Sequence, residues 1–262
     1  MLEIVKEILL ILVLVYVGFG VVLFFSQKSI IYYPDSQDFE SCPGFEDSEK
    51  LNLNGTRAYF KKSSDRLVVF YHGNAGSACD RAFLKDRFEK DGLSYLFVEY
   101  AGYSGDSKKP SSDLLIQDVE NIVEFIGGQD FKEVFVGGGS IGSSLAIYHS
   151  KLARVDKMLL VTPFYSVKDM AKKLYGVYPI SLMLTDNYDS NEWIKETKAG
   201  KIKIIHGEED EIIPISQSRK LYEEILVENK EYVSIKDAHH NDIYDFKETW
   251  TAISNFLAKS ND

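Results

Sequence analysis

Gly138-Gly-Ser-Ile-Gly142 lies between two stretches of different hydrophobic period. Residues 133–137, Glu-Val-Phe-Val-Gly, predict a short buried strand, and residues 141–149 predict a helix. The pentapeptide has the pattern G-x-S-x-G, in which a serine occupies a sharp turn from a strand into a helix. Such a turn crowds the backbone, which favours glycine, and it holds the serine at the carboxyl edge of a sheet. We therefore predict that Ser140 is a nucleophile and that the backbone N–H of Ile141 faces an oxyanion.

A second glycine pattern overlaps the first. Gly137, Gly139 and Gly142 fit G-x-G-x-x-G, the fingerprint of dinucleotide-binding turns. That fingerprint needs an acidic residue about 20 positions later, at the end of the next strand. The next predicted strand, 157–161, is followed by Thr-Pro-Phe and no carboxylate. The sequence therefore favours the nucleophile turn, and no nucleotide or other cofactor is predicted.

Apolar runs and helical patterns alternate along most of the chain. Strands are predicted at 67–71, 95–98, 133–137, 157–161, 202–205 and 232–235, and helices at 81–90, 114–126, 141–149, 215–227 and 245–257. This alternation predicts an α/β fold with a mainly parallel sheet and helices on both faces. Residues 164–200 separate two strands by far more than a usual connection. They predict a small helical lid over the site, with Phe164, Tyr165, Tyr175 and Met183 as candidates to contact a substrate.

The amino-terminal region predicts a membrane helix. Residues 8–25 contain no charged or strongly polar side chain, a run just long enough to span a bilayer. We predict an uncleaved single-pass anchor within residues 1–28, followed by a catalytic domain at 29–262. A cleaved signal peptide and a buried core helix are the alternatives, but the apolar run is long for a signal peptide and no A-x-A site follows it. Charges flank the run almost evenly, so the side of the membrane stays undetermined.

Composition excludes some functions. The chain has 262 residues and a net charge of −10, which argues against nucleic acid as a partner, since phosphate contacts need a basic face. Its two cysteines, Cys42 and Cys79, have no metal-ligand spacing and can either pair or stay free. A metal site built from His239, His240 and Asp242 is an alternative for the last loop, but no further cluster supports it. No metal is therefore predicted.

Four segments follow predicted strands, at the edge where α/β sheets place their sites. His72-Gly-Asn-Ala-Gly76 can offer the N–H of Asn74 to an oxyanion, paired with that of Ile141. Ser140 is the second segment. Glu208, Glu209, Asp210 and Glu211 compete to supply the carboxylate that orients a catalytic histidine, and His239 or His240 can supply the base. The chain order of serine, acid and histidine matches this architecture.

These segments together resemble the α/β-hydrolase superfamily, and most closely a membrane-anchored branch of abhydrolase-domain esterases that includes protein depalmitoylases. The resemblance covers nearly the whole chain. It rests on the following motifs: Ser26-Gln-Lys-Ser-Ile-Ile-Tyr-Tyr-Pro34, His72-Gly-Asn-Ala-Gly-Ser77, Glu99-Tyr-Ala-Gly-Tyr103, Thr162-Pro-Phe-Tyr-Ser166, His206-Gly-Glu-Glu-Asp210 and His240-Asn-Asp242. Ala101 stands where the family usually has arginine, and His239 where it usually has glycine.

The resemblance implies roles for individual residues. Ser140 becomes the nucleophile, Asp210 the acid and His240 the base of a catalytic triad. We therefore expect a membrane-tethered serine hydrolase that cleaves acyl esters or thioesters, with a small molecule or a lipid as substrate. A serine peptidase of the same fold and an inactive α/β-hydrolase that serves as a binding scaffold are the alternatives. Labelling by a fluorophosphonate probe distinguishes an active hydrolase from a scaffold.

Overall fold

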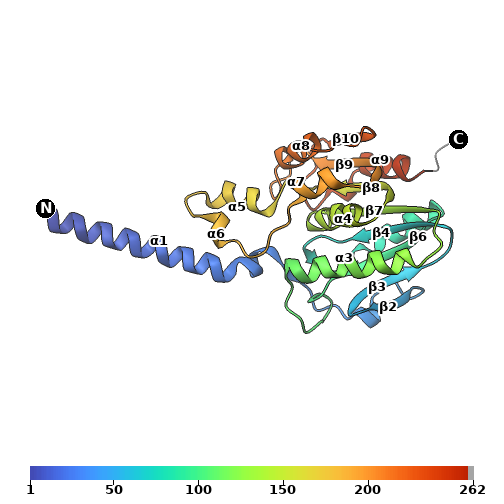
Figure 1. Cartoon of the computed structure of the whole chain (residues 1–262), viewed down its shortest axis with the longest axis horizontal. Coiled ribbons are helices and arrows are strands. Elements are labelled where there is room, and N and C mark those ends of the chain that lie inside the picture. The colour runs from blue at the N-terminus through green and yellow to red at the C-terminus, as the bar shows by residue number, and fades with distance from the viewer. Residues whose placement is uncertain (259–262) are drawn as a thin grey trace.

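A computed structural model describes residues 1–258 and shows a central twisted sheet with helices on both faces (Figure 1). The eight strands have the order β10-β9-β8-β7-β4-β6-β3-β2. Their bounds are β2 Glu49–Leu53, β3 Thr56–Lys61, β4 Arg66–Tyr71, β6 Ser94–Glu99, β7 Glu133–Gly139, β8 Val155–Val161, β9 Ala199–Gly207 and β10 Lys230–Ile235. All pairs from β10 to β6 are parallel, whereas β3 runs antiparallel to both β6 and β2. The predicted mainly parallel sheet is confirmed.

Helices cover both faces of this sheet. The α-helices of the body are α2 Lys85–Lys90, α3 Ser112–Gly127, α4 Ile141–Leu152, α8 Ile215–Glu223 and α9 Lys247–Leu257. Along β4, Leu67 and Val69 join the core under α3, α4 and α8, whereas Val68 and Phe70 join the core under α2 and α9. A strand buried on both faces alternates its side chains between two cores, which explains its unbroken apolar sequence.

Four local features differ from the sequence expectations. The first half of the helix predicted at 81–90 is a 3-10 helix, Cys79–Leu84, and the helix predicted at 215–227 ends at Glu223. The antiparallel pair β2–β3 was not predicted, nor was the short parallel pair of β1 Tyr33–Pro34 and β5 Ala75–Gly76. The remaining 3-10 helices are Phe39–Ser41, Ile194–Glu196 and Ile243–Asp245.

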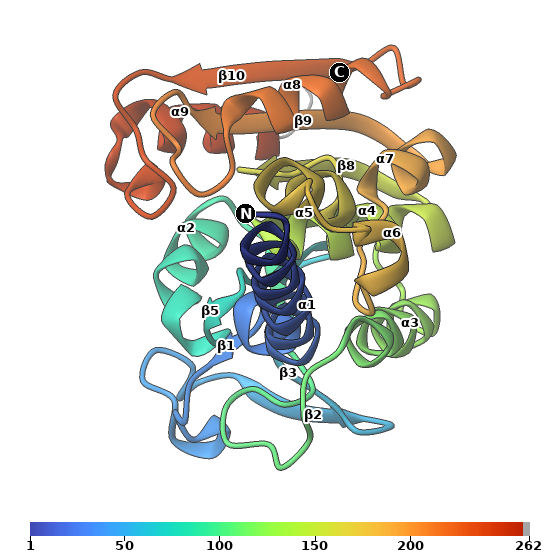
Figure 2. The same cartoon turned by 90° about the vertical axis from the view of Figure 1, so that its left-hand side faces the viewer.

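The amino-terminal helix α1, Leu2–Ile31, projects away from the sheet (Figure 1) and is seen nearly end-on in Figure 2. Its side chains are almost all exposed, and Gly20 is the one residue of α1 that is buried. Among residues 1–258 it is the one helix long and apolar enough to cross a membrane, a test that a signal sequence also passes. Because α1 lies outside the core, the alternative of a buried core helix is wrong.

Residues 164–200 form three short α-helices, of which two, α5 and α6, lie beside α1 (Figures 1 and 2). They are α5 Val167–Tyr175, α6 Ile180–Met183 and α7 Ser190–Trp193. We call residues 164–200 the lid. On the other side of the site, a disulfide joins Cys42 to Cys79 with their Cα atoms 5.7 Å apart. It ties the connector after α1 to the segment that follows β5.

Candidate active site

Ser140 occupies the turn between β7 and α4 in a backbone conformation that side chains rarely adopt. Its φ is 53° and its ψ is −122°. A non-glycine residue held there stores strain, and such strain gathers at functional sites. The backbone N–H of Ser140 donates to the carbonyl of Val161 at 2.9 Å, which fixes the turn against the neighbouring strand β8. The side chain is thereby presented at the carboxyl edge of the sheet.

At two positions of the pentapeptide, Gly138 and Gly142, the neighbouring backbone leaves no room for a side chain. A Cβ on Gly142 would lie 2.1 Å from the carbonyl oxygen of Tyr71, and a Cβ on Gly138 would lie 2.1 Å from that of Gly142. Neither backbone atom can rotate away. Gly137 and Gly139 have more room, since the atoms nearest to a Cβ there are 3.4 and 3.6 Å away. The pattern that the backbone enforces is therefore G-x-S-x-G rather than the dinucleotide fingerprint.

A hydrogen bond joins the buried Asp210 to the partly buried His240. His240 Nδ1 lies 2.7 Å from Asp210 Oδ2, and the N–H groups of Ile212 and Ile213 donate to Asp210 Oδ1 at 3.0 and 2.7 Å. His206 Nε2 lies 3.3 Å from the same carboxylate. Burial opposes the charge on Asp210, but the hydrogen bonds from His206, His240 and Ile213 outweigh it and hold its pKa well below the usual range. Asp210 is therefore a stable anion facing an imidazole.

The other candidate acids and the second histidine lie on the surface. Glu208, Glu209 and Glu211 are exposed, whereas Asp210 is buried. His239 is also exposed, and its Nδ1 lies 3.0 Å from Glu211 Oε2. That contact raises the pKa of His239. The geometry thus separates the pair of Asp210 and His240, whose acid is buried, from the exposed pair of Glu211 and His239.

The loop that holds Asn74 is fixed by two tyrosines from the segment after β6. The hydroxyl of Tyr103 donates to the carbonyl of Asn74 at 2.9 Å, and that of Tyr100 donates to the carbonyl of His72 at 2.7 Å. The ring of Tyr100 stacks on His72 with centroids 3.8 Å apart. Sequence reasoning gave these tyrosines no role, although their place directly after a strand at the site edge was a usable signal.

Asp118, in α3, binds the segment that follows β6. Its carboxylate accepts from the hydroxyl of Thr56 at 2.6 Å and from the N–H of Ala101 at 2.8 Å. Only 3 % of the residue is exposed. Burial raises the pKa of Asp118 to about 6, and these hydrogen bonds only partly offset the effect. The carboxyl group under the loop after β6 therefore has a pKa above the usual range of aspartate.

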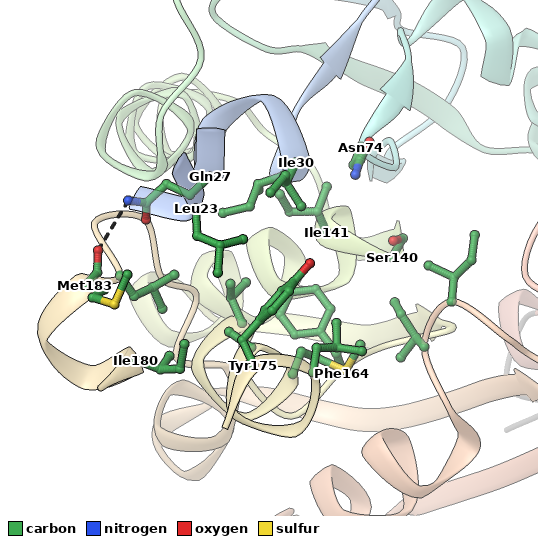
Figure 3. A pocket seen from close by; sticks show the side chains of 18 of the residues that line it. Leu23, Gln27, Ile30, Asn74, Ser140, Ile141, Phe164, Tyr175, Ile180 and Met183 are labelled. Carbon is green, nitrogen blue, oxygen red and sulfur yellow. Dashed lines mark hydrogen bonds between the residues drawn. The ribbon is translucent and has the colours of Figure 1, made fainter. Parts of the chain in front are cut away.

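Two cavities meet at Ser140. An apolar cavity of about 280 Å³ lies on the lid side (Figure 3), and a larger, more polar cavity of about 880 Å³ lies on the His240 side. Ser140 and Asn74 line both cavities, and Ile141 lines the apolar one. Among the described residues no hydrogen bond joins Ser140 to His240, and in unliganded sites such bonds often form only when substrate binds.

The lid residues singled out from sequence divide into two groups. Phe164, Tyr175 and Met183 line the apolar cavity. Tyr165 is absent from that lining; its hydroxyl donates to Glu224 at 3.0 Å and its N–H donates to Gln217. Within residues 1–258 no cluster of histidine, cysteine or acidic side chains could hold a metal ion.

The chain is similar to proteins of a bacterium, a virus and a yeast. It is 29% identical to the uncharacterised protein Rv2307c of Mycobacterium tuberculosis over 261 residues, which cover 93% of this chain and 92% of the relative. It is 27% identical to a protein of Acanthamoeba polyphaga mimivirus that is named as an α/β hydrolase, covering 75% and 82% of the two chains. It is 24% identical to an uncharacterised membrane protein of Saccharomyces cerevisiae, covering 75% and 72%. No family model matches the chain.

Solved structures share the fold over most of their length. An esterase of Pyrococcus furiosus superposes with a TM-score of 0.66 at 18% identity, covering 87% of this chain and 97% of the esterase. A monoacylglycerol lipase of Paleococcus ferrophilus superposes with a TM-score of 0.58 at 17% identity, covering 80% and 98%. At these identities the likeness establishes the fold alone.

Proposed function

The chain has the fold of α/β hydrolases and is similar in sequence to a protein named as one, and we propose that it is a serine hydrolase that cleaves acyl esters or thioesters. One observation carries the proposal. Ser140, in its strained turn, and His240, hydrogen-bonded to a buried Asp210, line the same cavity. A nucleophile, a base and an acid that orients the base are the parts that acyl transfer requires.

The contacts of His240 decide which of its nitrogens acts. Nδ1 is bound to Asp210, which leaves Nε2 to take the proton of the Ser140 hydroxyl as the oxygen attacks the substrate carbonyl. Asp210, whose low pKa keeps it ionised, stabilises the imidazolium that forms. The tetrahedral oxyanion is bound by the N–H of Ile141, which is the first residue of α4 and has no intrahelical partner, and by that of Asn74.

The rest of the reaction returns the enzyme to its starting state. The imidazolium donates its proton to the leaving alcohol or thiol as the bond from the carbonyl carbon to that group breaks, which leaves an acyl ester on Ser140. Water then attacks this ester while His240 takes a water proton. The carboxylic acid leaves, and the proton passes from His240 back to the Ser140 oxygen.

The two cavities suggest how a substrate lies. The apolar cavity beside Phe164 and Met183 accepts the acyl chain, and the more polar cavity beside His240 accepts the leaving group. Each methylene buried in the apolar cavity can add up to about 0.8 kcal/mol of binding. Catalytic efficiency is therefore expected to rise from acetyl towards octanoyl esters. We also propose that α1 attaches the enzyme to a membrane, in keeping with its length and its exposed apolar surface.

The proposal is tested by a fluorophosphonate probe together with hydrolysis of p-nitrophenyl esters. Wild-type protein should be labelled and should hydrolyse the esters, and Ser140→Ala should lose both activities while keeping its circular dichroism spectrum. Ser107→Ala, which changes an exposed serine in a loop, is the matched control and should behave as wild type. Labelling and turnover that persist in Ser140→Ala would refute the assignment.

A further inference from the structure

One wall of the apolar cavity is formed by α1. Side chains from the last turns of α1 line it together with the lid, and Ser140 lies at its inner end (Figure 3). The contributors from α1 are Leu23, Phe24, Gln27, Ile30 and Ile31. A simple tether would not need to reach the site. The helix that would enter the membrane is therefore continuous with the surface that would hold the acyl chain.

Contacts with the lid fix this part of α1 in place. The rings of Tyr16 and Tyr178 stack with centroids 4.5 Å apart, and each hydroxyl donates to a lid or helix carbonyl. The hydroxyl of Tyr16 donates to the carbonyl of Val177 at 2.8 Å, and that of Tyr178 donates to the carbonyl of Tyr16 at 3.0 Å. Gly20 faces the same ring, since a Cβ there would lie 3.0 Å from Tyr178. This explains why Gly20 is buried while its neighbours on α1 are exposed.

Closer to the sheet, hydrogen bonds between polar groups also hold α1 against the lid. Gln27 donates its amide to the carbonyl of Met183 at 3.2 Å and accepts the N–H of Thr185 at 2.8 Å. One turn further on, Tyr32 donates to the carboxylate of Asp186 at 2.9 Å, and Lys28 lies 3.7 Å from the same residue. The contact between α1 and the lid thus extends from Tyr16 to Tyr32, about 24 Å along the helix.

If α1 crosses a membrane, its contact with the lid places the lid at the level of the bilayer. Tyr16 lies in the middle of the uncharged run 8–25, about 14 Å along the helix from Phe25. The lid loop that meets it exposes three apolar side chains, Leu174, Val177 and Leu182, which are 68%, 77% and 86% exposed. The carbonyl of Val177 in this loop accepts a hydrogen bond from the Tyr16 hydroxyl. Lys172 and Lys173, exposed at the end of α5, can extend to lipid phosphates.

We propose that α1 is part of the substrate site and that the outer loop of the lid enters the bilayer beside it. The acyl chain of a membrane-resident ester then passes sideways along α1 into the apolar cavity and reaches Ser140 without leaving the lipid. This inference rests on the proposed function, and it names the substrate class as long-chain acyl esters or thioesters of membrane molecules.

The first test measures acyl-chain preference in full-length protein reconstituted in phosphatidylcholine vesicles. Leu23→Trp fills part of the cavity, whereas Leu12→Trp adds the same ring to an exposed position on α1 outside the cavity. Each methylene displaced reduces efficiency up to roughly fourfold. The ratio of octanoyl to acetyl efficiency should fall roughly tenfold or more in Leu23→Trp, the effect of two or more methylenes, and should stay within about twofold in Leu12→Trp.

Equal ratios in the two variants would overturn the inference while leaving the hydrolase intact. Loss of the proposed function itself looks different, because wild-type protein would then show no hydrolysis that depends on Ser140. The ratio is measured only on variants that the fluorophosphonate probe labels, so an unfolded variant is recognised. The second test below needs no activity.

The second test measures the depth of the lid. Both cysteines are paired, so Val177→Cys introduces a single thiol for a nitroxide label. In vesicles this label should collide with oxygen, which concentrates in lipid, more often than with a polar nickel complex. A label at Lys236→Cys, an exposed position after β10, is the control and should show the reverse order. A nickel accessibility at 177 equal to that at 236 would place the lid in water and overturn the inference.

Discussion

Gly142→Ala is expected to destabilise the protein and to slow hydrolysis, because the added methyl group meets the backbone at the end of β4. It would lie 2.1 Å from the carbonyl oxygen of Tyr71 and 2.3 Å from that of His72. Overpacking of this kind costs up to about 3 kcal/mol, and no flexible side chain is present to yield. Alanine in place of glycine inside a helix contributes about 1 kcal/mol in the opposite direction. The net loss in unfolding free energy is therefore about 2 kcal/mol.

The matched control lies in the same pentapeptide. A methyl group on Gly139 would have its nearest contact 3.6 Å away, at the hydroxyl of Tyr244, so Gly139→Ala should change stability little. Thermal unfolding followed by circular dichroism measures both variants. A loss of about 2 kcal/mol lowers the melting temperature by about 4 to 8 °C in a domain of this size.

Activity provides the second readout of this comparison. The methyl group of Gly142→Ala pushes α4 away from β4, and this moves the Ile141 N–H from the oxyanion position. A shift of about 1 Å at such a site can reduce the rate about a hundredfold. If Gly142→Ala were as stable and active as wild type, or if Gly139→Ala were the more damaging change, the packing described for this turn would be contradicted.

Three further predictions concern the triad, the buried carboxyl group and the membrane. Asp210→Asn and His240→Ala should each reduce kcat by several orders of magnitude. His239→Ala and Glu211→Gln alter the exposed pair and should reduce kcat less than about tenfold. A larger loss in His239→Ala than in His240→Ala would identify His239 as the catalytic base. Burial raises the pKa of Asp118 from 3.8 to about 6, so the folded protein holds this proton more tightly than the unfolded chain. The free energy of unfolding should therefore fall by about 3 kcal/mol as the pH rises from about 4 to about 6. Thermal melts of Asp118→Asn should lack this pH dependence, whereas those of wild type should show it. Full-length protein should sediment with membranes and resist sodium carbonate extraction, since α1 is held by apolar contact rather than charge, and its recovery in the soluble fraction would contradict the anchor.

The strands, the nucleophile turn and the candidate triad segments were accessible from the sequence because each is encoded locally. The buried strands are apolar runs, and the turn is marked by glycines that lie against backbone. In contrast, β2 reads Glu-Lys-Leu-Asn-Leu and is too polar to stand out, because it forms the edge of the sheet. The assignments of Ser140, Asp210 and His240 stay predictions that the mutants above can test.

Features that depend on tertiary packing could not be predicted. The pairing of Cys42 with Cys79 requires two segments 37 residues apart to meet. Periodicity did not separate Tyr175, which lines the cavity, from Tyr165, which packs against α8. The contact of α1 with the lid was equally hidden, since an apolar helix of this kind reads as a membrane span and gives no sign of a second role.

The disulfide bears on the orientation that the protein would have in a membrane. Bonds of this kind persist in oxidising compartments and are rare in the cytosol, where thiols are kept reduced. Cys42 and Cys79 lie after α1, on the same side of the apolar run as Ser140. If α1 crosses a membrane, the hydrolase domain is therefore expected on the face away from the cytoplasm, with Met1 on the cytoplasmic side. Such a topology would expose the site to the outer leaflet, and the lipids of that leaflet would be the esters within its reach.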